Sequence, residues 1–126
     1  MALKSNNLNV LFVDDDEAIM DMANQMLARL GHTVIGETES LKALRYFSEH
    51  PDDFDLAIID PTIVGITGLK LAQRFRMIRR GFPVILYGGD IDSSLLHDAE
   101  EAGVSCCQKP ATRKEMERAI VKALKR

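Results

Sequence analysis

Apolar and polar positions follow two different periods along the chain, and the period switches at regular intervals. Five short apolar runs are bounded by charged or turn residues, and each has the length of a strand that is buried on both faces. They lie at residues 8–13, 33–35, 56–59, 83–87 and 104–107. After each run, apolar residues recur at spacings of three and four, which is typical of an amphipathic helix. The pattern therefore predicts five strands that alternate with five helices.

Several residues mark where the predicted helices begin and end. Gly31 ends the first helix, whose predicted buried face comprises Ile19, Met22, Ala23, Met26, Leu27 and Leu30. Ser40 is expected to cap the second helix, with Leu41 turned inward. Thr112 and Glu115 have the spacing of a capping box at the start of the fifth helix.

Alternating strands and helices joined by short loops are typical of a parallel sheet with helices on both faces. Right-handed crossovers leave few topologies for such a chain. With 126 residues, the sequence has the length of one domain and can bury a core without disulfides or metals. We therefore expect a single α/β domain over residues 1–126, with a core from about residue 8 to about residue 125. Both ends resemble domain edges, as in a piece of a longer protein.

The composition is that of an ordinary globular domain, with 46% hydrophobic and 28% charged residues. The net charge of −3 does not indicate nucleic-acid binding, and Arg76, Arg79 and Arg80 suit the end of a helix, where they favour its dipole. No apolar run approaches the roughly 20 residues of a membrane span, and the N-terminus lacks the apolar centre of a signal peptide. The adjacent Cys106 and Cys107 suit neither a disulfide framework nor a zinc site. We expect a cytoplasmic domain that contacts neither nucleic acid nor membrane.

Charged residues stand where three of the predicted strands end. Asp14 and Asp15 follow the first strand, Asp60 follows the third and Lys109 follows the fifth. The carboxyl ends of parallel strands meet at one edge of the sheet, where the ligands of open α/β folds bind. Pro61 cannot continue a central strand, so Asp60 is expected at that edge. Taken alone, Asp60 is equally an acid that caps a turn, and Asp14 and Asp15 equally belong to the start of a helix.

Three carboxylates at one edge repel each other and raise each other's pKa unless a cation lies among them. Oxygen ligands without His or Cys indicate Mg²⁺ or Mn²⁺, and Mg²⁺ in particular pairs with phosphate oxygens. A lysine directed at the same point offers a point charge for a phosphoryl group. The set predicts a phosphoryl-transfer site with Asp60 as the candidate nucleophile. His32, His50 and His97 lie outside this set and are expected at the surface or on helices.

Together these residues resemble a response-regulator receiver domain. The likeness rests on residues 10–16 (VLFVDDD), on Asp60 with Gly68 eight residues later, on residues 83–86 (PVIL), and on Lys109 with Pro110. Residues 55–71 and 82–89 are most similar to receivers fused to hybrid sensor histidine kinases. The resemblance implies a flavodoxin-like (βα)5 fold with strand order 2-1-3-4-5 and helices on both faces.

The resemblance also implies an acceptor and a metal site. Asp60 would accept a phosphoryl group from the phosphohistidine of a histidine kinase or a histidine phosphotransfer domain. Asp15, Asp60 and the backbone carbonyl of Thr62 would ligate Mg²⁺ (or Mn²⁺), and Asp14 would act on the ion through a water molecule.

The phosphoryl oxygens would be bound by Lys109 and by the backbone N–H groups of Thr62 and Gly89, again by resemblance. The Lys109–Pro110 peptide bond would be cis, an arrangement that is available before proline.

Two switch positions depart from the family's pattern. Gly88 stands where the family usually carries Thr or Ser at the end of the fourth strand, and Cys106 stands where it usually carries Tyr or Phe. Val64 replaces a usual proline, whereas Pro61 directly follows the acceptor. We therefore expect phosphorylation to change the distal face, around the predicted fourth helix and fifth strand, less than in receivers that carry Thr and Tyr at these two positions. The paired Gly88 and Gly89 tolerate conformations that other residues do not, which makes them candidates for any remaining movement.

Two functions from different classes follow. The first is a phosphoacceptor receiver of a two-component phosphorelay. The second is a pseudo-receiver, a protein-interaction module that binds its partner regardless of phosphate. Neither is a conventional enzyme: the receiver would catalyse its own Mg²⁺-dependent phosphoryl transfer, and any kinase activity would lie in another domain.

Overall fold

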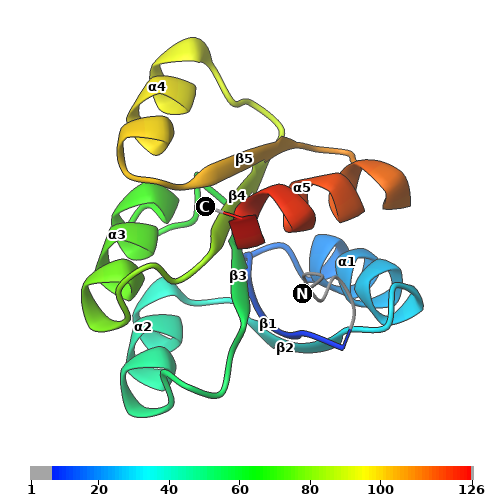
Figure 1. Ribbon diagram of the computed structural model, residues 1–126, viewed down its shortest axis with the longest axis horizontal. Coiled ribbons are helices and arrows are strands. Elements are labelled where there is room, and N and C mark those ends of the chain that lie inside the picture. The colour runs from blue at the N-terminus through cyan, green and yellow to red at the C-terminus, as the bar shows by residue number, and fades with distance from the viewer. Residues whose placement is uncertain (1–6, 126) are drawn as a thin grey trace.

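A five-stranded parallel sheet lies between two layers of helices in the computed structural model, which describes residues 7–125 (Figure 1). The strand order is β2-β1-β3-β4-β5. The strands are β1 (Asn9–Val13), β2 (Thr33–Glu37), β3 (Leu56–Ile59), β4 (Val84–Gly88) and β5 (Ser105–Gln108). The helices are α1 (Glu17–Arg29), α2 (Ser40–Glu49), α3 (Gly68–Ile78), α4 (Ser93–Glu101) and α5 (Arg113–Lys125). The predicted flavodoxin-like fold and its strand order are confirmed, while residues 1–6 and 126 of the predicted domain lie outside the described residues.

The sheet separates two apolar cores, one under α2, α3 and α4 and the other under α1 and α5 (Figure 1). Successive residues of β1 alternate between them: Leu11 and Val13 belong to the first core, and Val10 and Phe12 to the second. Burial on both faces explains why the strands are continuous apolar runs rather than alternating ones. Each fully buried Leu or Ile contributes about 1.5–3 kcal/mol relative to exposure, so both cores hold the sheet in place.

The helix ends differ from the prediction at one position. Thr112 and Glu115 form the expected capping box, in which each side chain accepts from the backbone N–H of the other residue at 3.1 and 2.9 Å. Ser40 does not cap α2, because Glu39 is the N-cap residue and the Ser40 hydroxyl bonds to the loop after β3 instead. The prediction of a Ser40 cap was therefore wrong.

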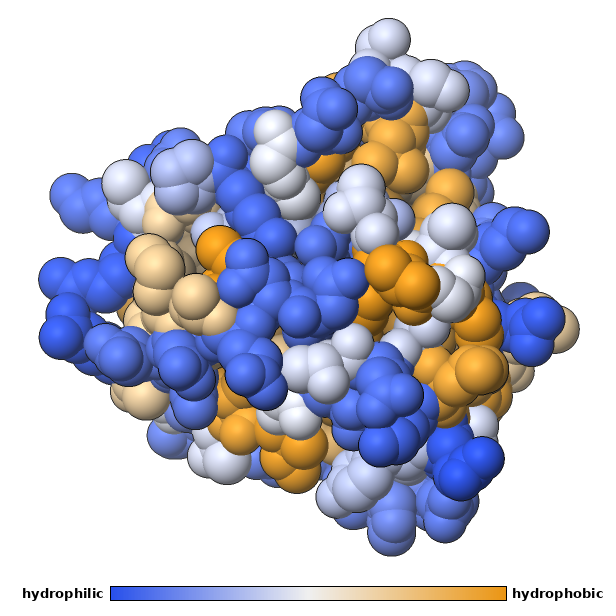
Figure 2. All heavy atoms as spheres, turned by 180° about the vertical axis from the view of Figure 1, so that it is seen from behind, coloured by the Kyte–Doolittle hydropathy of each residue, from blue (hydrophilic) through white to orange (hydrophobic). Residues whose placement is uncertain are grey.

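The predicted buried faces of two helices were too wide. Met22 of α1 and Leu41 of α2 are both 65% exposed. A helix buries a limited stripe of its surface, and these two residues lie outside it. The surface opposite the view of Figure 1 shows hydrophobic areas interrupted by hydrophilic residues (Figure 2). Within residues 7–125, none of the helices combines the length and the apolar character of a membrane-spanning helix.

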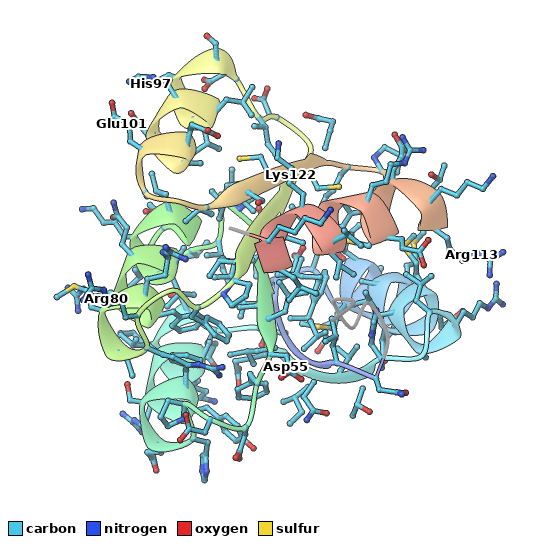
Figure 3. The ribbon with its side chains drawn as sticks, viewed as in Figure 1. Asp55, Arg80, His97, Glu101, Arg113 and Lys122 are labelled. Carbon is cyan, nitrogen blue, oxygen red and sulfur yellow. The ribbon has the colours of Figure 1, made fainter. Side chains whose placement is uncertain are left out.

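The arginines at the end of α3 bond to nearby backbone. Arg79 Nη1 donates to the carbonyls of Pro51 and Phe54 at 3.1 and 2.6 Å, and Arg76 Nη1 donates to the Phe82 carbonyl at 2.7 Å. Both side chains therefore hold adjoining loops against α3, which supports the structural interpretation of these two residues. Arg80 points into solvent (Figure 3).

The histidines lie outside the strand-end cluster, but one was misplaced by the prediction. His50 and His97 are exposed, and His97 Nε2 lies 3.0 Å from Glu101 Oε1 on α4 (Figure 3). His32 is buried between α1 and β2, where its Nδ1 accepts from the Leu8 N–H at 3.2 Å. Burial lowers the pKa of the His32 imidazole below its ordinary value, which favours the neutral ring that this bond requires.

Candidate functional site

The sheet brings the charged strand ends to one point. β1 and β3 are neighbours with Val13 opposite Ile59, so Asp14 and Asp60, the next residues, leave the sheet side by side. Lys109 follows β5, two strands from β3, and reaches them with its long side chain. Its Nζ lies 2.8 Å from Asp14 Oδ2 and 3.5 Å from Asp60 Oδ2. The predicted convergence of the two carboxylates and the lysine is confirmed.

Asp14 is the most enclosed of the acids, with no exposed side-chain surface. Its burial raises the pKa of the carboxyl, although hydrogen bonds from Lys109 and from the Asp16 N–H act in the opposite direction. Burial alone would lower the pKa of the Lys109 ammonium, but its hydrogen bond to Asp14 and the charges of Asp14 and Asp60 outweigh burial and raise that pKa. The lysine is therefore charged at neutral pH and stabilises the buried carboxylate.

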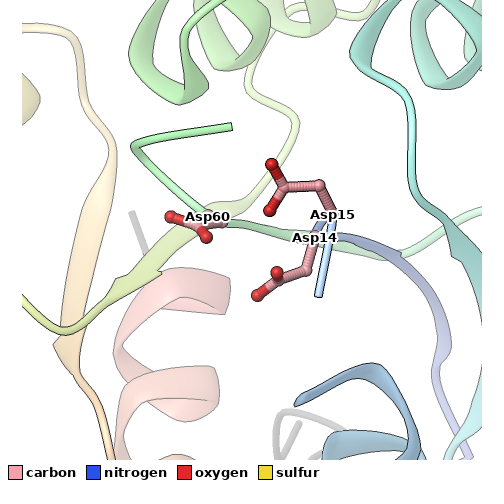
Figure 4. A group of neighbouring side chains, drawn as sticks. All are labelled: Asp14, Asp15 and Asp60. Carbon is pink, nitrogen blue, oxygen red and sulfur yellow. The ribbon is translucent and has the colours of Figure 1, made fainter. Parts of the chain in front are cut away.

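Asp14, Asp15 and Asp60 form an acidic cluster at the ends of β1 and β3 (Figure 4). One carboxylate oxygen from each lies within 4.8 Å of the others. Three carboxylates and one ammonium leave two negative charges in excess, the charge that a divalent cation neutralises. Hard oxygen donors in this number suit Mg²⁺, so the residues present fit the implied metal.

The two oxygens of the Asp60 carboxylate have different surroundings. Oδ1 accepts from the N–H and from the hydroxyl of Thr62, both at 2.9 Å, whereas Oδ2 faces Lys109. These bonds orient the carboxylate before any ligand arrives, and 11% of the Asp60 side chain remains exposed. The Asp60 carboxylate is therefore accessible and already held in one orientation.

Pro61 occupies the space beside Gly88, the position where the family usually carries Thr or Ser. Gly88 is buried, and a Cβ at that position would lie 2.6 Å from Pro61 Cγ and 2.8 Å from Cδ. Real Cβ atoms essentially never approach other atoms so closely. The two departures from the family pattern, a proline directly after Asp60 and a glycine at the end of β4, thus meet in one packing contact.

The backbone of the paired glycines is ordinary in this structure, and their expected role in movement stays a prediction. Neither Gly88 nor Gly89 is among the glycines with positive φ. Gly88 is the last residue of β4 and pairs with Gln108 of β5. Glycine is therefore required at position 88 by the approach of Pro61 rather than by an unusual conformation.

The loop after β5 is also ordered by contacts that the sequence did not indicate. The Tyr87 hydroxyl accepts from the Ala111 N–H at 3.2 Å, and Lys109 Nζ lies 5.5 Å from the centre of the Tyr87 ring. The Lys109–Pro110 bond is cis, as expected. Cys106 is half-buried and packs against the core under α2, α3 and α4.

Comparison with known proteins gives the family. The sequence profile described as "Response regulator receiver domain" matches residues 10–121. The chain belongs to this family. It is 30% identical over 99 residues to a putative two-component response regulator of Arabidopsis thaliana, a match that covers 79% of this chain and 15% of the relative.

Other similar proteins are not all response regulators, and one is a sensor protein. The domain is 39% identical over 70 residues to the virulence sensor protein BvgS of Bordetella pertussis, covering 56% of this chain and 6% of that protein. A solved response regulator receiver domain protein of Clostridium thermocellum has a TM-score of 0.82 and 26% identity, with 94% of each chain covered. The chain spans 15% or less of both curated relatives. A regulator and a sensor thus both contain a domain of this kind, in agreement with the expected likeness to receivers of sensor proteins.

Proposed function

We propose a phosphoacceptor function for this chain, which is a receiver domain of two-component signalling. We propose that Asp60 is its phosphoacceptor and takes the phosphoryl group from a phosphohistidine of a histidine kinase or a histidine phosphotransfer domain. The observation that carries this proposal is the meeting of Asp14, Asp60 and Lys109 at the ends of β1, β3 and β5. A pseudo-receiver that ignores phosphate is not favoured, because the acceptor, the acidic cluster and the lysine are all present together.

In the proposed transfer, an Asp60 carboxylate oxygen attacks phosphorus. The new P–O bond forms as the P–N bond to the histidine breaks, and the imidazole leaves with the electron pair of that bond. Lys109 is placed beside Asp60 Oδ2 to pair with an oxygen of the incoming group. The backbone N–H groups of Thr62 and Gly89 are the further proposed donors, and 11% exposure of Asp60 leaves room for approach.

We propose that Asp15, Asp60 and the Thr62 carbonyl hold Mg²⁺ (or Mn²⁺), with Asp14 acting through water. When bound, the ion would neutralise negative charge on the phosphoryl oxygens and on the cluster. The excess of two negative charges at this edge supports the assignment.

Mg²⁺ is expected to stabilise the fold through this cluster. At ten times its dissociation constant a ligand contributes ~1.4 kcal/mol, which corresponds to a Tm increase of roughly 5 °C in a domain of this size. Thermal melts with and without ~20 mM Mg²⁺ measure it. Asp15→Asn should reduce the increase, while Asp55→Asn, at the far end of β3, should retain it. An unchanged wild-type Tm would contradict the metal site.

Acetyl phosphate with Mg²⁺ is expected to add one phosphoryl group to the protein. Intact-mass spectrometry measures the gain, and Asp60→Asn should abolish it because the nucleophilic oxygen is replaced by an amide. Asp55→Asn is the matched control, since Asp55 bonds to the Asn9 N–H and lies outside the cluster. Labelling that persists in Asp60→Asn would refute the assignment.

We also propose that the domain acts in the cytoplasm and contacts neither nucleic acid nor membrane directly. The net charge of −3 and the adjacency of Cys106 and Cys107, which does not suit a disulfide framework, support this proposal.

A further inference from the structure

Ser40 connects the start of α2 to the loop that carries the acceptor. The residue is 2% exposed. Its hydroxyl donates to the Val64 carbonyl at 3.1 Å and accepts from the Ile66 N–H at 2.9 Å. These partners lie 24 and 26 residues further along the chain. Ser40 therefore uses both its donor and its acceptor on one segment of the β3–α3 loop.

Gly65 lies between Val64 and Ile66, and the lack of a side chain at this position allows the contact with Ser40. Its φ of +98° lies in the region that favours glycine, and a Cβ there would lie 2.7 Å from Ser40 Oγ. A residue without a side chain thus lets the loop backbone close onto the hydroxyl.

Two backbone hydrogen bonds also hold the same loop together next to Asp60. The Ile63 N–H donates to the Asp60 carbonyl at 3.3 Å, and the Gly68 N–H donates to the Pro61 carbonyl at 3.2 Å. Thr62 lies inside this closed loop and holds Asp60 Oδ1 through its N–H and hydroxyl. The loop segment that Ser40 holds is therefore continuous with the residue that bonds to the Asp60 carboxylate.

We propose that Ser40 is a positioning residue for the phosphoryl-transfer site. By holding Val64 and Ile66, it fixes the orientation of the Thr62 peptide and, through it, the Asp60 carboxylate. Burial of Ile63 anchors the loop as well, but apolar packing does not orient peptide groups as directional hydrogen bonds do. This inference rests on the proposed function of Asp60.

Ser40→Ala tests the proposal, with Ser48→Ala as its matched control on the same helix. Ser48 is exposed, and its hydroxyl donates to the Leu44 carbonyl at 2.8 Å, away from the loop. Ser40→Ala is expected to weaken Mg²⁺ binding about tenfold, the low end of the range for losing a residue that helps to orient metal ligands. It should also slow phosphoryl uptake from acetyl phosphate and speed amide exchange at Thr62 and Ile66 in the metal-free protein. Ser48→Ala should match the wild type in all three.

Gly65→Ala reaches the same contact from the other side, so it serves if Ser40→Ala does not fold. Its control is Gly81→Ala, which shares the positive φ but has no atom within 4 Å of the new Cβ. Weaker Mg²⁺ binding in Gly65→Ala alone supports the proposal.

The proposed role of Ser40 would be overturned by a Ser40→Ala protein that binds Mg²⁺ within about twofold of wild type and labels at the same rate, whatever its Tm. A wild type that neither binds Mg²⁺ nor labels overturns the proposed function first, and the role of Ser40 with it.

Discussion

Gly88→Thr is expected to destabilise the fold by about 2 kcal/mol, although it restores a residue type usual for the family. The new Cβ would lie 2.6 Å from Pro61 Cγ, and overpacking of a filled site costs about 1–3 kcal/mol. Pro61→Ala in the same chain removes the ring and should recover most of the loss. Urea unfolding of both single variants and the double variant measures the coupling between the two positions.

Gly89→Thr is the control for this cycle, because a Cβ at that position has no atom within 4 Å. It should change the free energy of unfolding by less than about 0.5 kcal/mol. A Gly88→Thr protein as stable as wild type, or a double variant that recovers nothing, would show that Pro61 and Gly88 are not one contact.

The Pro61–Gly88 contact also changes how the switch is to be tested. The expectation that phosphorylation alters the distal face only weakly stays a prediction. Restoring the hydroxyl and the ring requires Pro61→Ala together with Gly88→Thr and Cys106→Tyr, since the threonine alone has no space. Phosphorylation should change amide exchange around α4 and β5 more in this triple variant than in wild type. A large change in wild type would contradict weak coupling.

Lys109→Met is expected to destabilise the metal-free protein by about 3 kcal/mol at neutral pH. Removing one partner of a buried ion pair leaves the other charge uncompensated, which costs about 3–5 kcal/mol, and Asp14 has no exposed side-chain surface. Asp14→Asn in the same chain should recover much of the loss. Denaturant unfolding in the presence of a chelator measures both effects, and Lys122→Met, on the exposed side of α5, is the control.

The loss in Lys109→Met should shrink as the pH falls. Burial already raises the pKa of Asp14 above its ordinary value, and the lysine opposes that increase. A carboxyl whose pKa is raised by folding stabilises the fold when protonated and loses that contribution as the pH rises through the folded pKa. Without the lysine the pKa rises further, so protonation removes the uncompensated charge at a higher pH. A loss that stays constant from pH 7 down to about pH 4 would contradict this account.

The meeting of charged residues at the strand ends was predictable because each strand end is visible in the local sequence and a parallel sheet brings such ends together. Asp14, Asp60 and Lys109 each follow an apolar run, and parallel strands place their carboxyl ends together. The resemblance added strand order, and with it the adjacency of Asp14 and Asp60, which the sheet confirms.

Other parts of the site depend on tertiary contacts that no local pattern encodes. Ser40 has the residue type of a helix cap, but Glu39 is the N-cap residue and the Ser40 hydroxyl bonds to the loop after β3 instead. Pro61 and Gly88 were visible as separate departures, but their contact follows from the neighbouring positions of β3 and β4. His32 was expected at the surface or on a helix, whereas it is buried beside β2 and accepts a hydrogen bond from the Leu8 N–H.

Phosphoryl transfer from a phosphohistidine protein is the most direct test of Asp60 as the phosphoacceptor. A phosphotransfer domain, phosphorylated on its histidine and mixed with this chain and Mg²⁺, should lose its phosphoryl group as the chain gains one. Borohydride reduction of the acyl phosphate and peptide mapping then locate it. One label is expected, at Asp60, absent from Asp60→Asn and retained in Asp55→Asn. A label at another residue, or none from a donor that phosphorylates other receivers, would contradict it.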